Sequence, residues 1–206
     1  EKIVFFAGMS RQKDIYIMAA NYLQALDWQN DPKVLKNIVT FYTKGQAYDL
    51  LANFYAVSAQ AEIDDFRDYV KALKALQEAA KSLVKISPNH SALETLQHSI
   101  LGVKQFLELH DSAERHDFNL VIGGCKHLLS QKEQAPTRHC DILGLLIESQ
   151  ISIKQYAEAL VTLRELTQRQ PDWSNREIID RSLIEKLAHE TGVDFNQLWN
   201  SGRNPL

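Results

Sequence analysis

The chain has 206 residues, of which 45% are hydrophobic and 24% are charged, and its formal net charge at pH 7 is −3. Its apolar runs are much shorter than the roughly 18 residues that a membrane-spanning helix needs, so direct membrane insertion is excluded. Eight glycines and five prolines are too few for a fibrous or disordered chain. These values predict a soluble, folded protein.

The ends and the cysteines indicate where the chain belongs. It begins with Glu1 rather than Met, and the apolar run at residues 3–8 is too short and too weakly basic in front for a signal peptide. We therefore expect a fragment of a longer protein. Cys125 and Cys140 are its two cysteines, which is typical of a reducing compartment such as the cytosol rather than of a disulfide framework.

Apolar residues recur at three- and four-residue spacing almost from end to end, which predicts an all-α fold of about ten helices. The first helix is expected to end near Leu26, with Tyr22 and Leu26 on its apolar face. Pro32 suits the first position of the second helix, and Asp31 precedes it as the capping residue. Gly45 is expected to end that helix in the left-handed conformation.

The remaining helices follow in chain order. We expect Asp64 and Asp65 to lie at a helix start, where carboxylates meet the positive end of the helix dipole. Val70 is expected on the inward stripe of the next helix, and Gly123 and Gly124 are expected to permit close helix packing or a kink. Short loops predict antiparallel hairpins. The apolar stripes place these helices near residues 47–61, 69–83, 93–107, 118–128, 142–153, 156–169, 178–187 and 195–199.

Three segments fit the pattern of a tetratricopeptide repeat. In that repeat an aromatic residue is followed by a small residue and then by large apolar residues, with a proline just beyond the helix. Tyr156, Ala159, Leu163, Leu166 and Pro171 match the whole pattern. The series that begin at residues 69 and 118 match it in part. The sequence therefore predicts a right-handed α-solenoid of antiparallel helical hairpins built from irregular tetratricopeptide-like repeats.

Clusters of polar residues offer little chemistry. No block is strongly basic, which excludes a typical nucleic-acid binder. Residues 108–117 contain carboxylates and imidazoles, but a charged turn between helices does not converge them on one ion. Cys125 and His127 diverge on a helix, and adjacent His139 and Cys140 chelate poorly. We expect no metal and no cofactor. The aromatic residues at 41, 42, 48, 54 and 55 are interpreted as core.

A resemblance to a known family lies in the first half of the chain. It is carried by Phe5 and Phe6, by residues 11–28 (RQKDIYIMAANYLQALDW) and by residues 36–55 (KNIVTFYTKGQAYDLLANFY), and it continues to about residue 85. These stretches resemble the C-terminal tetratricopeptide-like region of the intraflagellar transport protein 140 family. Beyond residue 85 the match is one of architecture.

The resemblance implies a non-enzymatic scaffold of intraflagellar transport complex A. Its implied partners are the other complex A subunits and, indirectly, dynein-driven retrograde trains and ciliary membrane cargo. Its implied location is the cytoplasmic side of the cilium, including the basal body and the axoneme. Two alternatives stay open: a tetratricopeptide scaffold of a vesicle-coat-like or other cytosolic assembly, and a helical metal-dependent hydrolase.

The two ends of the solenoid are expected to differ. We treat residues 1–206 as one domain, in which residues 172–206 form capping helices. Trp199 is expected to be mostly buried within its own chain. Val4, Phe5 and Phe6 are expected to be partly exposed, because they would pack on an upstream repeat in a longer chain, and they are therefore candidate protein-interaction residues.

Overall fold

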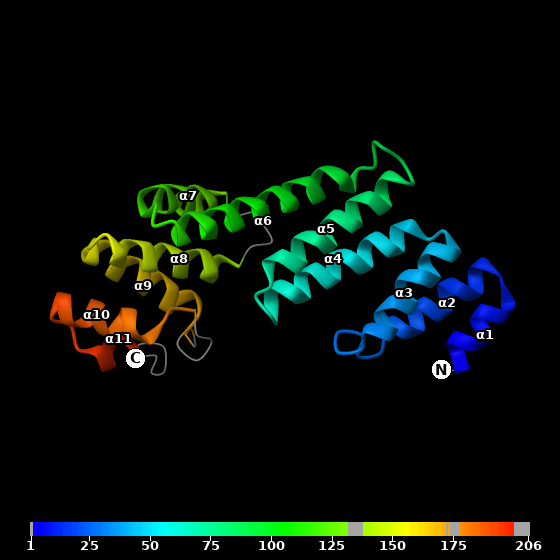
Figure 1. Ribbon diagram of the computed structural model, residues 1–206, viewed down its shortest axis with the longest axis horizontal. Helices are drawn as coiled ribbons and strands as arrows, with labels where there is room; N and C mark the ends of the chain where they lie inside the picture. The colour runs from blue at the N-terminus through cyan, green and yellow to red at the C-terminus, as the bar shows by residue number, and fades with distance from the viewer. Residues whose placement is uncertain (1, 132–137, 172, 174–177, 200–206) are drawn as a thin grey trace. The chain divides into compact units, whose positions relative to one another are not determined.

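The computed structural model describes residues 2–131, 138–171, 173 and 178–199, which are helical in eleven segments and contain no strand. The predicted all-α class is confirmed, and consecutive helices pack on one another (Figure 1). The additional helix covers Lys2–Ser10. The helices are α1 (Lys2–Ser10), α2 (Lys13–Gln24), α3 (Pro32–Gly45), α4 (Tyr48–Asp64), α5 (Tyr69–Val84), α6 (Ala92–Glu114), α7 (Phe118–Ser130), α8 (His139–Ser152), α9 (Tyr156–Arg169), α10 (Arg181–Thr191) and α11 (Phe195–Trp199).

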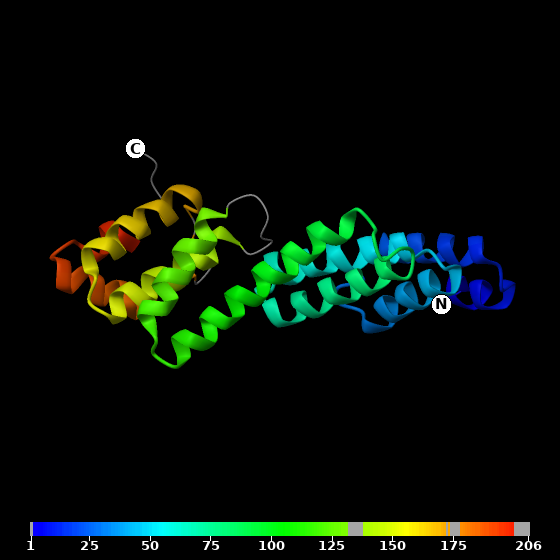
Figure 2. The ribbon, with the colours of Figure 1, turned by 90° about the horizontal axis from the view of Figure 1, so that it is seen from above.

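The chain divides into two compact units, residues 1–100 and residues 101–206. The boundary lies within α6, between Ile100 and Leu101. In the first unit, α2 pairs with α3 and α4 pairs with α5, and Figure 2 shows the α4–α5 hairpin from above. In the second unit, α8 packs against both α7 and α9.

Aromatic residues form much of the core of the first unit. Tyr16 of α2 stacks on Phe41 of α3 with ring centroids 5.6 Å apart. Phe54 of α4 is fully buried, and Trp28 meets it edge-on at 5.0 Å. Offset and edge-on arrangements suit the ring quadrupoles. The interpretation of the aromatic residues at 41, 42, 48, 54 and 55 as core is confirmed, since all five belong to this cluster.

The ends of α3 confirm one prediction and correct another. The Asp31 side chain accepts hydrogen bonds from the backbone N–H groups of Lys33 and Val34, and Pro32 begins the helix. Gly45, however, is the last helical residue, and Gln46 adopts the left-handed conformation with φ 56°. Gly45 is instead needed for space, because a Cβ there would lie 2.7 Å from Cγ1 of Ile17.

Other corrections concern the surface of the first unit. Tyr22, Leu26 and Val70 are exposed, because the buried stripes of α2 and α5 run through smaller residues such as Ala19 and Ala72. Asp64 ends α4 and Asp65 follows it, so neither stands at a helix start. The capping carboxylate of α5 is Asp68, which accepts a hydrogen bond from the backbone N–H of Lys71 and has a lowered pKa chiefly for that reason. The prediction of a carboxylate at the start of this helix was correct, but the capping residue is Asp68, three residues after Asp65.

The second unit is organised around α8, which is buried on almost every side. Residues 141–147 are all buried, and so are residues 149–151. Its neighbours are α7, α9 and α10, and the carbonyl oxygen of Ile178 approaches it at Gly144. Leu143, Ile147 and Ile151 of α8 belong to a hydrophobic core cluster that also contains the fully buried Trp173. The indole N–H of Trp173 donates a hydrogen bond to the Thr167 hydroxyl at 3.1 Å.

The C-terminal elements follow the predicted order with one shift. Ile178 and Ile179 are buried, but they precede α10 instead of lying in it. Gly192 follows α10 as its C-terminal cap and adopts the left-handed conformation, with φ 69°. Trp199 is half-buried and packs within its own chain, edge-on against Trp173 at 5.3 Å. Residues 172, 174–177 and 200–206 of the predicted capping segment lie outside the described residues.

The repeat pattern is reflected in the packing. Ala159, Leu163 and Leu166 of α9 are all buried, with Ala159 completely so. The corresponding positions of α5 and α7 are buried as well, which places small side chains where two helix backbones approach each other. These residues are Tyr69, Ala72, Leu76 and Ala79 on α5, and Val121, Cys125 and Leu128 on α7.

Candidate protein-interaction surfaces

Helix α1 carries an exposed apolar patch. Its inward side is formed by Ala7, which is buried, and by Ile3 and Val4, which pack partly buried against the core of the first unit. Phe5 and Phe6 point outward with 62% and 65% of their surface exposed, and their rings meet edge-on at 5.6 Å. We call Phe5, Phe6 and the 68% exposed Met9 the α1 patch.

The structure thus separates the three predicted interaction residues. Phe5 and Phe6 are exposed, whereas Val4 packs partly buried against the core of the first unit. An apolar patch on a helix surface is costly unless something covers it, because each exposed aromatic ring leaves a large apolar area in water. On the neighbouring helix α2, Met18 and Tyr22 are four residues apart and also exposed.

A second apolar feature is a groove between α6 and α7 in the second unit. It encloses about 320 Å³ and is lined by Leu109, Leu120, Gly124 and Leu128, with Glu108 and His127 among its polar residues. A Cβ at Gly124 would overlap the Leu109 side chain, so this glycine permits the close helix approach predicted for the pair. A Cβ at Gly123 would meet nothing within 4 Å, so close helix packing does not require a glycine at that position.

A further groove, of about 290 Å³, lies between α9 and the C-terminal elements. Leu160, Leu163 and Leu198 supply its apolar lining, and Arg164, Thr167 and Gln197 supply polar groups. Sequence periodicity did not predict either groove, because a groove depends on the gap between helices and not on the pattern along one of them.

The predicted metal-ligand candidates do not converge. Within the described ranges no three His, Cys, Asp or Glu side chains are arranged to hold a metal ion. His110 meets the Phe106 ring edge-on at 6.0 Å, and His127 lies 2.8 Å from the Gln131 side chain. Cys125 is fully buried, and burial raises the pKa of its thiol to about 12. A thiol with that pKa is neither a ready nucleophile nor a ready metal ligand at neutral pH.

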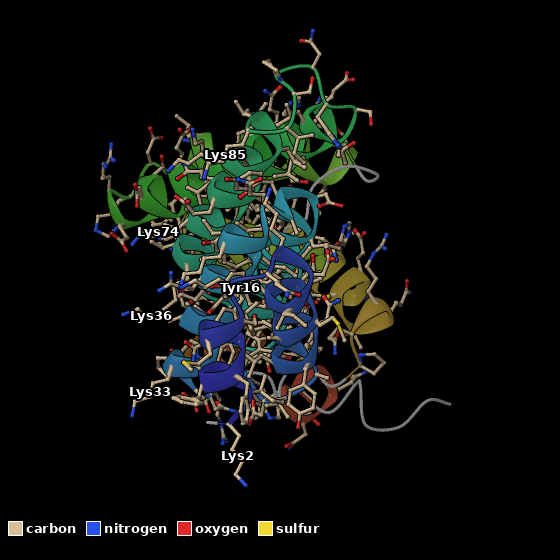
Figure 3. All side chains as sticks on the ribbon, turned by 90° about the vertical axis from the view of Figure 1, so that its right-hand side faces the viewer. Lys2, Tyr16, Lys33, Lys36, Lys74 and Lys85 are labelled. Carbon is tan, nitrogen blue, oxygen red and sulfur yellow. The ribbon has the colours of Figure 1, made fainter. Side chains whose placement is uncertain are left out.

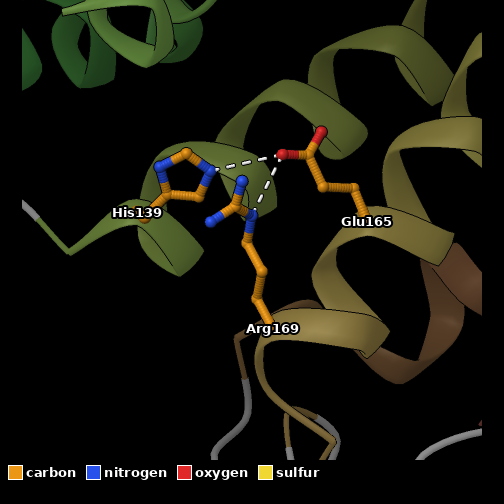
Figure 4. A network of polar contacts seen from close by, with 3 residues as sticks. All are labelled: His139, Glu165 and Arg169. Carbon is orange, nitrogen blue, oxygen red and sulfur yellow. Dashed lines mark hydrogen bonds and ion pairs between the residues drawn. The ribbon is translucent and has the colours of Figure 1, made fainter. Parts of the chain in front are cut away.

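His139 instead takes part in a polar network that joins α8 to α9 (Figure 4). Its Nε2 lies 3.4 Å from Oε1 of Glu165, and the same oxygen accepts a hydrogen bond from Nε of Arg169 at 3.1 Å. Burial raises the pKa of the Glu165 carboxyl, but the hydrogen bonds from His139 and Arg169 outweigh it, so the pKa is lowered. The network connects two helices of one hairpin and resembles structural ion pairing.

None of the helices in the described part of the chain is long and apolar enough to cross a bilayer. Each unit instead combines antiparallel helical hairpins, small residues at helix crossings and apolar surface left uncovered. These features define the class of the protein: it is a tetratricopeptide-type helical scaffold.

Comparison with known families identifies the scaffold further. The sequence model of the C-terminal TPR domain of intraflagellar transport protein 140 matches residues 49–167, more than half of the chain. The model of the TPR domain shared by intraflagellar transport proteins 140 and 172 matches residues 1–41. The chain therefore belongs to the family of the protein 140 C-terminal TPR domain, which confirms the resemblance found in the sequence. It is an intraflagellar transport scaffold related to complex A and associated with the cilium.

Proposed function

We propose that this chain is a non-enzymatic, protein-binding module of intraflagellar transport complex A, supporting retrograde ciliary transport and the entry of ciliary membrane cargo. Its partners would be other complex A subunits directly, and dynein-driven trains and membrane cargo through them. It would act on the cytoplasmic side of the cilium, at the basal body and along the axoneme. Residues 1–206 would work as one solenoid domain, with residues 172–206 as its cap.

The α1 patch is the observation that carries this proposal. Two neighbouring phenylalanines more than 60% exposed on a helix whose other side is anchored form a rigid apolar contact surface. Rigid aromatic anchors contribute most to protein–protein binding, because they bury a large area at little entropic cost. We propose that Phe5 and Phe6 contact an apolar helix face of another subunit, and that Val4 supports them from beneath.

The experiment is co-purification of complex A subunits with the tagged protein from ciliated cells, comparing the wild type with the double variant Phe5→Ser, Phe6→Ser. The matched control is Val57→Ser, Val161→Ser, which removes two exposed apolar side chains from α4 and α9. We expect the phenylalanine variant to lose complex A subunits and the valine control to retain them. Retention by both would overturn the role of the α1 patch, and an absence of complex A subunits from the wild type would overturn the proposed function.

A further inference from the structure

Charge is distributed unevenly over the helices of the first unit. Helix α3 contains three lysines and no carboxylate, and α5 contains three lysines and one glutamate. Helix α4 is the reverse, because it contains three carboxylates and no Lys or Arg. The second helices of the two hairpins are therefore basic, although the chain as a whole is slightly acidic.

Part of this positive charge has no internal partner. Lys71 lies 3.0 Å from Asp68, and Lys81 lies 2.7 Å from Glu78, so these two lysines are paired. The other seven lysines of the unit are exposed and form no ion pair with any residue in the described ranges. Two of them have other contacts, since Lys13 donates to the Gln46 side chain and Lys44 lies over the Tyr16 ring. The remaining five, which we call the lysine face, are Lys2, Lys33, Lys36, Lys74 and Lys85.

In Figure 3, Lys33, Lys36 and Lys74 follow one edge of the first unit, at the left of the view, with Lys85 above them and Lys2 below. Lys33 and Lys36 are three residues apart on α3 and therefore neighbours on its surface. Lys85 lies over the Tyr48 ring with its Nζ 5.0 Å from the ring centroid, which orients it without neutralising it. Several uncompensated ammonium groups on one side attract an anionic partner.

We propose that the lysine face binds an acidic, extended polypeptide segment of a partner protein; this deepens the proposed function, on which it rests. Charge complementarity selects the sign of the partner. Around Lys33 and Lys36, the exposed positions of α3 carry no large apolar side chain that could enter a bilayer, which favours a peptide over a membrane surface there. Exposed apolar residues lie instead at the ends of the face, at Val84 and Ile86 beside Lys85 and at Phe5 and Phe6 on the helix of Lys2. Asn37, half-buried beside Lys36, adds an amide group that can hydrogen-bond a peptide backbone. The nearby Thr40 hydroxyl donates to the carbonyl oxygen of Lys36 at 2.7 Å and can only accept from a peptide.

The test is the binding of a fluorescent polyglutamate peptide to the chain, measured by anisotropy. The variant is Lys33→Glu, Lys36→Glu, Lys74→Glu. The control, Lys104→Glu, Lys126→Glu, Lys186→Glu, changes the net charge equally at exposed lysines of the second unit. We expect the first triple variant to weaken binding by about tenfold or more and the control to weaken it much less, with salt reducing wild-type binding.

Three outcomes would overturn the proposal: equal loss in both variants, no binding by the wild type, or binding to vesicles of anionic phospholipid without binding to polyglutamate. A second measurement needs no variant. Polyglutamate should protect Lys33, Lys36 and Lys74 of the wild type from acetylation while leaving Lys104 and Lys126 reactive, and uniform protection would contradict a specific face. The Phe5→Ser, Phe6→Ser variant should bind polyglutamate normally, so failure of this proposal is distinguishable from failure of the proposed function.

Discussion

The helices of the first unit and helix α8 of the second unit use their surfaces differently. Helix α3 buries Ile38, Phe41 and Tyr42 on one side and leaves lysines and threonines on the other. Helix α8 is buried almost completely, with ten of its fourteen residues in the interior. One-sided burial leaves a face free for partners, whereas burial on all sides fixes a core. We infer that the first unit provides contact surfaces and that α8 chiefly provides stability.

The largest expected effect lies in the core around α8. Trp173 is fully buried, and replacing it with Ala removes its packing and its hydrogen bond to Thr167. We expect a loss of about 3–5 kcal/mol in the free energy of unfolding, measured by urea denaturation. Trp199→Ala is the control, because Trp199 touches the same cluster but is only half-buried, and its loss should be smaller. Equal losses would contradict the central position of Trp173.

The second prediction tests the close approach of α9 to its neighbours. Ala159 is completely buried, and Ala159→Leu should overpack the site and cost about 1–3 kcal/mol. Ala157→Leu introduces the same side chain two residues earlier, at an exposed position of the same helix, and should be nearly neutral. An unchanged melting temperature for Ala159→Leu would show that the repeat pattern does not report packing here.

A smaller effect is expected for the polar contact between α2 and α3. The hydroxyl of the buried Tyr42 lies 2.7 Å from Oδ1 of Asn21 and 2.8 Å from Oε1 of Gln24. Tyr42→Phe removes these contacts and should lower stability by about 0.5–1.5 kcal/mol. Tyr22→Phe, at an exposed position of α2, serves as the control in the same thermal unfolding experiment. Indistinguishable results for the two variants would argue against a stabilising hydroxyl at position 42.

The smallest effect is a pH dependence at the α8–α9 network. Because the pKa of Glu165 is lowered in the folded chain, its stabilisation is present above the ordinary carboxyl pKa and is lost as pH falls through the lowered value. Glu165→Gln should therefore destabilise the chain at neutral pH, by no more than about 1 kcal/mol because the pair is partly exposed. The difference from the wild type should shrink under acid conditions, and a difference that grows on acidification would reverse the assigned sign.

Sequence periodicity predicted the helices well where burial is one-sided. Helix α9 has the predicted bounds, and Asp31 and Pro32 begin α3 as expected. The sequence was less informative about which exposed residues share a surface, because Val70 and Tyr22 extend an apolar pattern yet face water. Helix α1 was not predicted, since a run of consecutive apolar residues lacks the polar positions that reveal a helical period.

The candidate site was predicted only in part. Phe5 and Phe6 were identified from an apolar run with no evident cover, and their exposure agrees with that expectation. The lysine face was not found, because its members lie on different helices and no short stretch of the sequence brings them together. The importance of Trp173 was also missed, since it lies between helices and fits no helical stripe.

Amide hydrogen exchange, measured on the chain alone and again within purified complex A, tests the division of roles between the two units most directly. We predict that assembly slows exchange in α1 and α3, where partners are expected to bind, while α8 is already protected in the isolated chain and changes little. Slower exchange confined to α8 and α9, with α1 and α3 unchanged, would contradict the assignment of contact surfaces to the first unit.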